Sequence, residues 1–248
     1  MGLWSSVGGA ISSACSSIGG AISGACSAVG SFFGSVASGL STVLDSVASF
    51  ASSVGVGGLL TVLSIAFPVL GRVIAAVEVV LHVLGLLEPK EQLEEFGDRV
   101  LQAESAGIIP HDFSTYKEYV AKIRDFELDP EKSKQYNAGD KVIAAMSVQY
   151  WGMNERFGIG SGELLTHVVS DIVKNKDSVE DTYFTEARIK NILEKVESLA
   201  DVANYFSGKL DAEDRQAVEK QLVNAEQELN PERSELEITR ELEAKNNE

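Results

Sequence analysis

The sequence predicts an all-α protein, in which a long Gly/Ser/Ala-rich amphipathic helix with an eleven-residue repeat and an apolar helical hairpin precede an acidic all-α helical domain. Two observations predict this class. Apolar residues recur every eleven residues near the N-terminus, and elsewhere they recur at three- and four-residue steps without period-two alternation. The predicted regions are the repeat at 1–53, a membrane-inserting helix or hairpin at 54–88, an acidic soluble domain at 89–230 and a charged tail at 231–248.

The eleven-residue repeat runs from Ser5 to Leu59, and each of its copies begins with a serine. A period of eleven corresponds to about 3.67 residues per helical turn, so one apolar stripe persists along a helix without drifting. Small residues beside the stripe permit close packing between helices, and the glycines among them are Gly8, Gly19, Gly30 and Gly34. The alternative is a Gly/Ser-rich leader that is disordered in water.

The most apolar part of the chain follows the repeat. Val54–Gly71 has no charge over 18 residues, which is the shortest length typical of a transmembrane helix. Pro68 is expected to kink or end that helix. Val73–Leu87 is a second apolar run, so the two runs fit a helical hairpin or one long kinked helix.

Glu78 and His82 interrupt the second apolar run and lie four residues apart, so they share one face of a helix. In lipid they would form a pore-facing, acid-responsive pair, because ionisable groups in membranes face a lumen or each other and histidine titrates near neutral pH. The alternative, which we prefer, is that Val73–Glu88 packs as the first soluble helix with both residues at its wet edge.

Charge divides the chain into two unlike halves. Asp45 is the only charged residue up to position 71. Residues 1–88 contain three acids and one arginine, a net charge of −2, which leaves −14 of the total −16 for residues 89–248. An apolar half joined to an acidic half is typical of a membrane-active segment with a soluble domain. The acidic excess argues against nucleic-acid binding, which needs Lys and Arg at the phosphates.

The N-terminus lacks a basic region followed by an apolar core, so a secretory signal peptide is not predicted. Gly2 and Ser6 satisfy the loose N-myristoylation pattern. Cys15 and Cys26 lie one repeat apart, roughly 16 Å along a helix, which is too far for a disulfide within that helix. We interpret them as small apolar fillers.

The acidic half is expected to form roughly six helices around one core. These helices are predicted at 89–105, 114–126, 139–157, 161–173 and 185–206, and from Asp211 or Asp214 to about 229. Caps and glycines are expected at their ends: Ser114, Ser161, Gly107 and Gly208. The closing run, 232–248, is charged with little to bury and is expected to form an exposed helix or a disordered tail.

No residue pattern indicates catalysis, a metal site or a cofactor, and the protein is predicted not to be an enzyme. The histidines, His82, His111 and His167, have no metal-binding spacing, and we interpret His167 on its apolar helix face as a core residue. The glycine-rich run Gly158–Gly162 lacks the Lys-Ser/Thr of a phosphate loop, so a helix stop followed by a helix cap explains it.

The first functional hypothesis is a membrane-inserting protein in which residues 1–88 form an oligomeric α-helical pore or conduit. Asp45, repeated around such a ring, would favour cations. A secreted toxin or effector has this layout, and so does an ejected virion protein. The Gly/Ala/Ser-rich leader resembles in composition those of phage pilot and ejection proteins. The protein would be secreted or packaged in a virion in soluble form and would reach a membrane after delivery.

The expected partners are therefore a lipid bilayer, further copies of the chain, and a chaperone, delivery machine or immunity protein. The second hypothesis is a peripheral membrane protein or scaffold whose acidic helical domain binds a partner protein. Its neutral Ser/Gly face is similar to that of amphipathic lipid-packing sensors, which respond to membrane curvature. A third hypothesis is a right-handed coiled assembly that never meets lipid.

Overall fold

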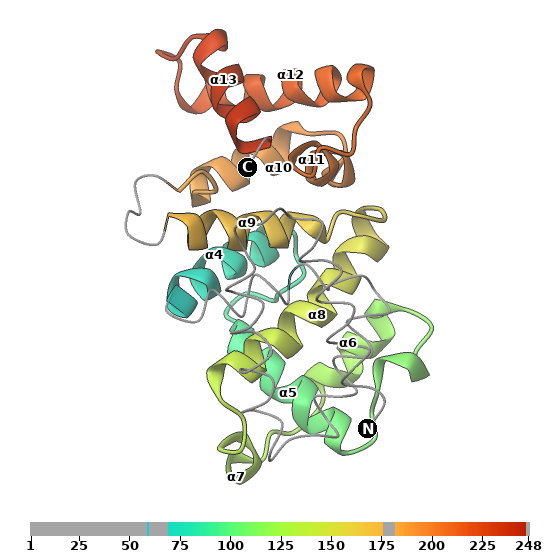
Figure 1. Cartoon of the computed structure of the whole chain (residues 1–248). Coiled ribbons are helices and arrows are strands. Elements are labelled where there is room, and N and C mark those ends of the chain that lie inside the picture. Colours follow the sequence, from blue (N-terminus) through green and yellow to red (C-terminus); the bar gives the residue numbers. More distant parts are fainter. Residues whose placement is uncertain (1–58, 60–68, 176–181, 247–248) are drawn as a thin grey trace, which may run out of the picture. The chain divides into compact units, whose positions relative to one another are not determined.

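The computed structural model describes residue 59, residues 69–175 and residues 182–246 (Figure 1). Every regular element in this part of the chain is a helix, which confirms the predicted all-α class. Apart from Leu59, the eleven-residue repeat lies outside the described residues. The same holds for the predicted site residues upstream of position 69: Gly2, Gly8, Gly19, Gly30, Gly34, Asp45 and Pro68. The roles assigned to them stay predictions.

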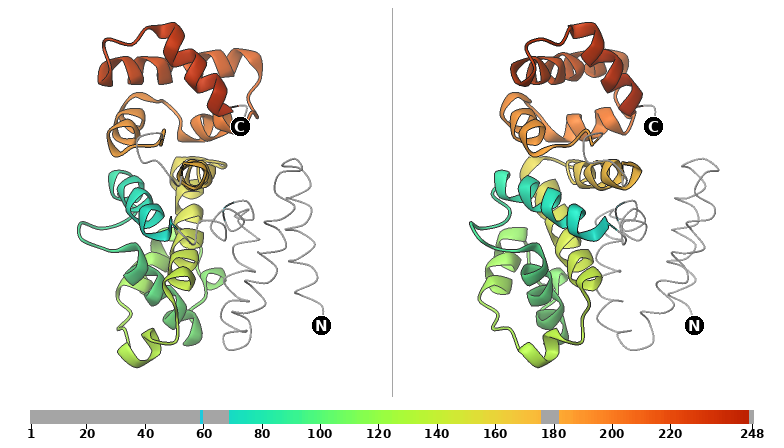
Figure 2. Two further views of the ribbon diagram at one scale, coloured as in Figure 1. Left: turned by 60° about the vertical axis from the view of Figure 1, so that its left-hand side comes forward. Right: turned by 90° about the vertical axis from the view of Figure 1, so that its left-hand side faces the viewer.

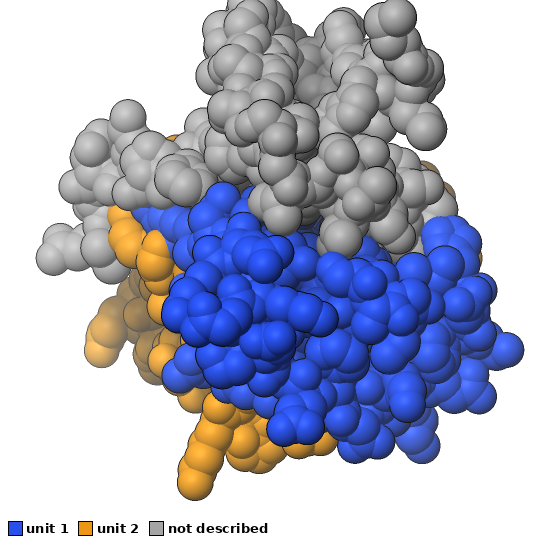
Figure 3. Space-filling view, turned by 90° about the horizontal axis from the view of Figure 1, so that it is seen from below, with its two compact units in different colours: residues 1–70, 92–148 blue, residues 71–91, 149–248 orange. Residues whose placement is uncertain are grey.

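The chain divides into two compact units, which Figure 3 shows in different colours. Unit 1 comprises residues 1–70 and 92–148, and unit 2 comprises residues 71–91 and 149–248. The division falls within one helix, α8 (Ala138–Phe157). Each unit has fully buried apolar side chains of its own, whereas the sequence had predicted one core for the whole acidic half.

Unit 1 contains α5 (Leu93–Ser105), the 3-10 helix η2 (Pro110–Asp112), α6 (Tyr116–Arg124), the short α7 (Pro130–Ser133) and the first part of α8. α5 packs against α6 and α7 (Figure 1). The core of unit 1 consists of side chains with no exposed surface: Leu93, Phe96, Val100, Leu101, Tyr119, Ile123, Val142 and Met146.

Unit 2 contains α4 (Leu70–Val83) from residue 71 on, the second part of α8, α9 (Glu163–Lys174), α10 (Glu186–Lys195), α11 (Leu199–Phe206), α12 (Ala212–Leu229) and α13 (Glu235–Asn246). α12 lies beside both α10 and α13, and α11 contacts α9 and α12 (Figure 2). Four aromatic rings meet edge to face in the core of unit 2: Tyr183, Phe184, Tyr205 and Phe206.

Several helix ends lie where local signals predicted them. Asp211 is the N-cap of α12, and its carboxylate accepts hydrogen bonds from the N–H groups of Glu213 and Asp214. Gly107 and Gly208 follow the ends of α5 and α11, as expected. These signals are reliable because a cap satisfies backbone groups within the same turn of chain.

Two helix starts differ from the prediction. α6 is capped by Thr115, not Ser114, because the Thr115 hydroxyl accepts the N–H of Glu118. α9 does not use Ser161 as a cap. Instead, Asn154 Oδ1 accepts the N–H groups of Gly160 and Gly162, at 3.1 and 3.0 Å, just before that helix begins.

The predicted helix at 185–206 is divided into α10 and α11. Val196 adopts an extended conformation, and the Ser198 hydroxyl caps α11 by accepting the N–H of Asp201 at 3.2 Å. The exposed N–H of Glu197 is satisfied by Gln221 on α12 at 3.0 Å. The apolar spacing continues across the break, so periodicity alone did not indicate it.

The charged C-terminal run forms α13, which buries more than its composition suggested. Ile238 and Leu242 have no exposed surface, whereas Leu236 is 59% exposed. Two apolar side chains at i and i+4 lie on one face of the helix, and that face packs against unit 2 through α12 and α11. The described part of this run is therefore an integral helix of unit 2.

Candidate functional site

The predicted pair Glu78 and His82 lies one turn apart on α4, and both side chains are half-buried. Val73, Val77 and Val80 on the apolar face of α4 have no exposed surface, and the helix from residue 71 on belongs to unit 2. This arrangement corresponds to the preferred alternative, in which the segment packs as a helix of a folded domain. Across the described residues, no helix is both long enough and apolar enough to cross a bilayer. The proposed pore-facing role of the pair stays a prediction.

The first turn of α4 is fixed by Arg72. Its guanidinium donates hydrogen bonds to the backbone oxygen of Asn175, at 3.2 Å, and to the hydroxyl of Thr182, at 3.1 Å. Asn175 and Thr182 stand on either side of residues 176–181, which lie outside the described residues. Hydrogen bonds from a charged donor are roughly twice as strong as neutral ones, so Arg72 is a substantial anchor for α4.

Asp171 on α9 positions Asn175, which accepts a hydrogen bond from Arg72. Its carboxylate is 5% exposed and accepts hydrogen bonds from the Asn175 side chain and from the N–H of Phe184, both at 3.0 Å. It also forms an ion pair with Lys245 of α13 at 3.0 Å. We call these residues the Asp171 junction: Arg72, Asp171, Asn175, Thr182 and Lys245. The junction links α4, α9 and α13.

A second arginine holds the other end of α4. Arg156 of α8 donates a hydrogen bond from Nη1 to the backbone oxygen of Gly85, at 2.9 Å. Gly85 has φ of +63° and ends α4 with the paired bonds of a Schellman motif, Gly85 N–H to His82 O and Leu86 N–H to Leu81 O. An arginine therefore fixes each end of α4. Arg72 in the first turn of the helix fixes its start, and Arg156 of α8 fixes its end.

A groove of about 360 Å³ runs along α4, which is within the size range of small-molecule sites. Its apolar walls come from α4, α9, α10 and the segment before α10: Ala75, Ala76, Val79, Ile172, Phe184 and Ile189. Arg72, Thr182, Thr185 and Glu186 complete the lining. The groove contains no arrangement of nucleophile and base, so its chemistry is that of apolar contact.

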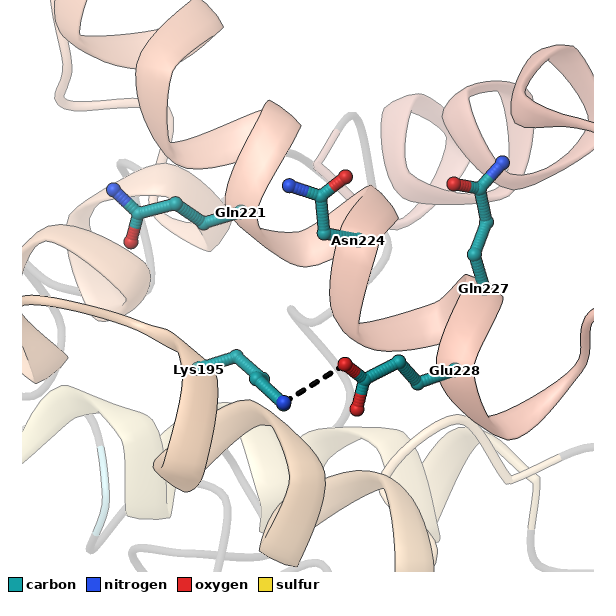
Figure 4. A pocket seen from close by; sticks show the side chains of 5 residues that line it. All are labelled: Lys195, Gln221, Asn224, Gln227 and Glu228. Atoms are coloured by element: carbon teal, nitrogen blue, oxygen red, sulfur yellow. Dashed lines mark ion pairs between the residues drawn. The ribbon is translucent and has the colours of Figure 1, made fainter.

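A second, polar groove of about 480 Å³ lies between α10 and α12 (Figure 4). It is lined by Lys195, Gln221, Asn224, Gln227 and Glu228. Lys195 and Glu228 form an ion pair across it at 2.8 Å, and their side chains are 38% and 57% exposed. Carboxamides both donate and accept hydrogen bonds, so this groove offers polar contacts without a catalytic group.

The α10–α12–α13 interface contains a buried network of charges. Arg188 Nε lies 2.5 Å from Glu226, which is 1% exposed, and Nη1 lies 3.4 Å from Glu241. Arg233 pairs with the same two acids, at 3.7 and 2.7 Å. Burial acts to lower the pKa of Arg188, but the charge of Glu226 and its hydrogen bond outweigh burial and raise the pKa. The network joins three helices and leaves the arginines charged.

Unit 1 contains a serine beside a lysine, which requires a test for catalysis. Lys141 Nζ lies 2.9 Å from both the Ser133 hydroxyl and the Asp98 carboxylate, and Ser133 donates a hydrogen bond to Asp98. Burial acts to raise the pKa of Asp98, but hydrogen bonds from Ser133, Lys141 and Gln102 outweigh it and lower the pKa. Activation of a serine nucleophile needs a base that is free to take its proton, whereas Lys141 is held in an ion pair with Asp98 and the serine hydroxyl donates to the same carboxylate. The cluster is a structural link between α5, α7 and α8.

Glu104 in unit 1 is a buried acid, and neither of its oxygens has a hydrogen-bond partner among the described residues. It is 7% exposed, and burial raises its pKa to about 8. No charge contributes to that shift, so desolvation alone accounts for it. The nearby Tyr119 has a raised pKa because of its burial and, to a smaller extent, the charge of Glu104.

The remaining histidines have structural surroundings. His167 Nε2 lies 3.0 Å from the Ser207 hydroxyl, which itself donates to the Ala203 carbonyl at 2.8 Å. Burial lowers the pKa of His167 to about 4, so it is neutral at physiological pH. His111 lies in η2. In the described ranges, no group of three or more His, Cys, Asp or Glu side chains could hold a metal ion.

The glycine-rich loop at 158–162 ends α8 and leads into α9, as predicted. Gly158 and Gly160 have φ of +98° and +99°, a region that favours glycine. Ile159 between them is 91% exposed, and it is an isolated apolar side chain at the tip of the loop. A single exposed apolar residue is common on protein surfaces, so the loop alone does not define a binding site.

The Asp171 junction and Arg156 were not found by sequence reasoning. The bonded residues lie 103 positions apart for Arg72 and Asn175, 74 for Lys245 and Asp171, and 71 for Arg156 and Gly85. No local pattern signals such contacts. The isolated arginine in an apolar run was the one available signal, because a charge at such a position requires a partner.

Comparison of the chain with known protein families, with characterised proteins and with solved structures finds no match. The functional argument therefore depends on the chemistry of the chain itself.

Proposed function

We propose that this protein inserts its apolar N-terminal region, residues 1–68, into a membrane and that copies of this region assemble into an α-helical pore or conduit. The helices from α4 onward, residues 71–248, stay in water on one side. The observation that carries the proposal is the distribution of charge. Asp45 is the only charged side chain among residues 1–71. An apolar stripe of this length requires lipid or other copies of itself to cover it.

The structure supports a narrower inserting region than residues 1–88. Four apolar side chains of α4 have no exposed surface, and Arg72 in its first turn is bonded to Asn175 and Thr182 of unit 2. In this folded form, Val73, Val77, Val80 and Leu81 of α4 are already buried. The apolar residues of 1–68 are those for which we propose lipid as the environment.

The charge of the acidic half is consistent with a domain that stays in water while the N-terminal region inserts. Residues 89–248 carry −14 of the net charge of −16, and such a surface keeps the helical units in water and away from anionic lipid. Partners such as a chaperone, a delivery machine or an immunity protein would bind these units. The polar groove between α10 and α12 provides hydrogen-bonding groups for a contact of this kind.

Dye release from vesicles tests the proposal with matched charge substitutions. The variant Ile11→Asp/Ile22→Asp places two charges on the predicted apolar stripe, and Ser12→Asp/Ser23→Asp places two on its small-residue flank. We expect the stripe variant to lose vesicle binding and dye release, while the flank variant still binds. Equal behaviour of the two variants would contradict an oriented amphipathic helix.

The peripheral alternative predicts a different result from the same assay. A lipid-packing sensor binds strongly to small, highly curved vesicles and releases no dye. Binding of the unmodified chain without release at any lipid-to-protein ratio would replace the pore with this peripheral function. Absence of binding to any vesicle would exclude both membrane functions.

A further inference from the structure

α4 is suited to two environments. Its sequence, LGRVIAAVEVVLHV, contains one arginine, one glutamate and one histidine, and its first two residues are the last two of the uncharged run Val54–Gly71. In the folded chain Val73, Val77, Val80 and Leu81 are completely buried, while Val83 is 38% exposed. Released from unit 2, α4 would extend the uncharged run into an apolar segment long enough for a hairpin in a bilayer.

The bonds at the start of α4 determine whether that release occurs. Arg72 donates to Asn175 O and Thr182 Oγ1, so α4 cannot leave unit 2 without breaking two hydrogen bonds of a charged group. Asn175 is in turn positioned by Asp171, which accepts its side-chain N–H at 3.0 Å. The strength of the anchor therefore depends on the position of Asp171 and its neighbours.

The C-terminal helix contributes directly to this anchor. Lys245 of α13 neutralises the buried Asp171 carboxylate at 3.0 Å. Without Lys245, Asp171 would be a buried charge with only neutral donors, which is an unfavourable state. Docking of α13 and retention of α4 are therefore coupled through one carboxylate.

The end of α4 is held independently. Arg156 is exposed and bonds Gly85 O, the carbonyl just beyond the helix. This contact and the Asp171 junction lie at opposite ends of α4, and each uses a charged side chain to bind it.

We propose that the Asp171 junction and the Arg156–Gly85 contact form a latch that holds α4 in unit 2, and that opening this latch adds α4 to the membrane-inserted segment. This inference rests on the proposed membrane insertion of residues 1–68 and deepens it. The latch keeps the inserted region short while α13 is docked. Loss of α13 or of the arginine contacts lengthens it.

An environment-sensitive fluorophore can distinguish the two positions of α4. The full chain with Cys15→Ala and Cys26→Ala is labelled with NBD at Val83→Cys, a partly exposed position, or at Val29→Cys in the leader. Each labelled protein is mixed with phosphatidylcholine–phosphatidylglycerol vesicles. The tests compare the unmodified latch with Arg72→Gln/Arg156→Gln and with Lys245→Gln, which changes no residue of α4. Arg240→Gln and Lys220→Gln are the controls, because both side chains are exposed.

With the latch intact, we expect the emission of the Val29 probe to shift to the blue and that of the Val83 probe to stay unchanged. In both latch variants the Val83 probe should shift as well, and in both controls it should not. A Val83 probe that stays aqueous in the latch variants, while the Val29 probe enters lipid, overturns the latch and leaves the proposed function intact. A Val29 probe that never enters lipid overturns the proposed function itself.

Hydrogen exchange without vesicles tests the latch separately. The amides of Val77–Leu81 should exchange at least about tenfold faster in the latch variants than in the two controls, because a lost hydrogen bond to a charged group favours local opening. Unit 1 amides such as those of Leu101 and Ile123 should be unaffected. Exchange of α4 at the unmodified rate in both latch variants would show that these contacts do not hold it.

Discussion

A Cβ atom placed on Gly97 of α5 would lie 1.8 Å from the backbone oxygen of Lys141 in α8. At that separation the two helices touch backbone to backbone, and any side chain at position 97 must displace one of them. Helix α8 cannot move alone, because the side chain of Lys141 is also bonded to Asp98 and Ser133. Position 97 therefore determines how closely α5 and α8 pack.

The substitution Gly97→Ala is expected to destabilise unit 1 by about 1–3 kcal/mol or more, because it overpacks a close helix contact. Urea unfolding followed by circular dichroism measures the change. Gly71→Ala is the matched control, since no atom lies within 4 Å of a Cβ at Gly71 in α4. Alanine is the better helix former, so the control should be neutral or slightly stabilising. Equal effects at the two positions would disprove the close contact.

Glu104→Gln is expected to change how stability depends on pH. A carboxyl with a folded-state pKa of about 8, above the ordinary 4.5, binds its proton more tightly when folded. The free energy of unfolding therefore falls by a few kcal/mol as the pH rises from about 4.5 to about 8. The glutamine variant should lack this decrease and be more stable than the original chain near pH 8.

The exposed Glu127 of unit 1 gives the control for this measurement. Glu127→Gln should leave the pH dependence of unfolding unchanged between about pH 5 and pH 9. If Glu104→Gln has the same slope as Glu127→Gln, Glu104 is ionised in the folded protein and is not isolated from water.

Glu226 and Glu228 on α12 should differ greatly in importance. Glu226 is 1% exposed and is the acid nearest to Arg188, so Glu226→Gln removes the principal counter-charge of Arg188 and the weaker of the two ion pairs of Arg233. Removing one partner from a buried ion pair costs about 3–5 kcal/mol. Glu228→Gln removes an exposed ion pair with Lys195 and should change stability by no more than the error of measurement.

Thermal unfolding of the two variants tests this contrast on a single helix. Glu226→Gln should lower the melting temperature by several degrees, and α13 should lose protection first because its Glu241 shares both arginines. A Glu228→Gln variant as unstable as Glu226→Gln would indicate that the polar groove contributes to folding. In that case, the importance of burial at this interface would be refuted.

Asp45→Asn is expected to reduce the cation selectivity of a channel formed by the leader. One carboxylate per copy around a ring attracts cations, and asparagine has the same shape without the charge. Reversal potentials in asymmetric salt across a planar bilayer measure the selectivity. A working channel with unchanged selectivity would show that Asp45 does not face the lumen.

Sequence reasoning predicted what depends on neighbours in the chain. Asp211 and Gly208 were found at helix ends because caps and glycine turns act within a few residues. The break at Val196 was missed, since the apolar spacing continues through it and the deciding partner, Gln221, belongs to another helix. The burial of Ile238 and Leu242 was missed for a similar reason, because α12 and α11 supply the surface they pack on.

The candidate site was less predictable than the fold class. Glu78 and His82 were found because their spacing is visible in one helix. The contacts of Arg72, Asp171 and Lys245 join distant segments, and nothing in the local sequence distinguishes Asp171 and Lys245 from ordinary surface residues. The physical signal that remains is an arginine within an otherwise apolar helix, which requires oxygen acceptors wherever that helix packs.

Unit 2 is assembled from residues 71–91 and 149–248, with residues 92–148 between them in the chain. During synthesis α4 emerges about 100 residues before Phe184, which lines the groove along it. Translation proceeds at about 5–20 residues per second, so roughly 5–20 seconds pass between the synthesis of α4 and that of the unit 2 residues that contact it. Throughout that interval, the leader and α4 form one continuous apolar nascent segment. The order of translation thus leaves α4 without its binding residues until the rest of unit 2 has been made.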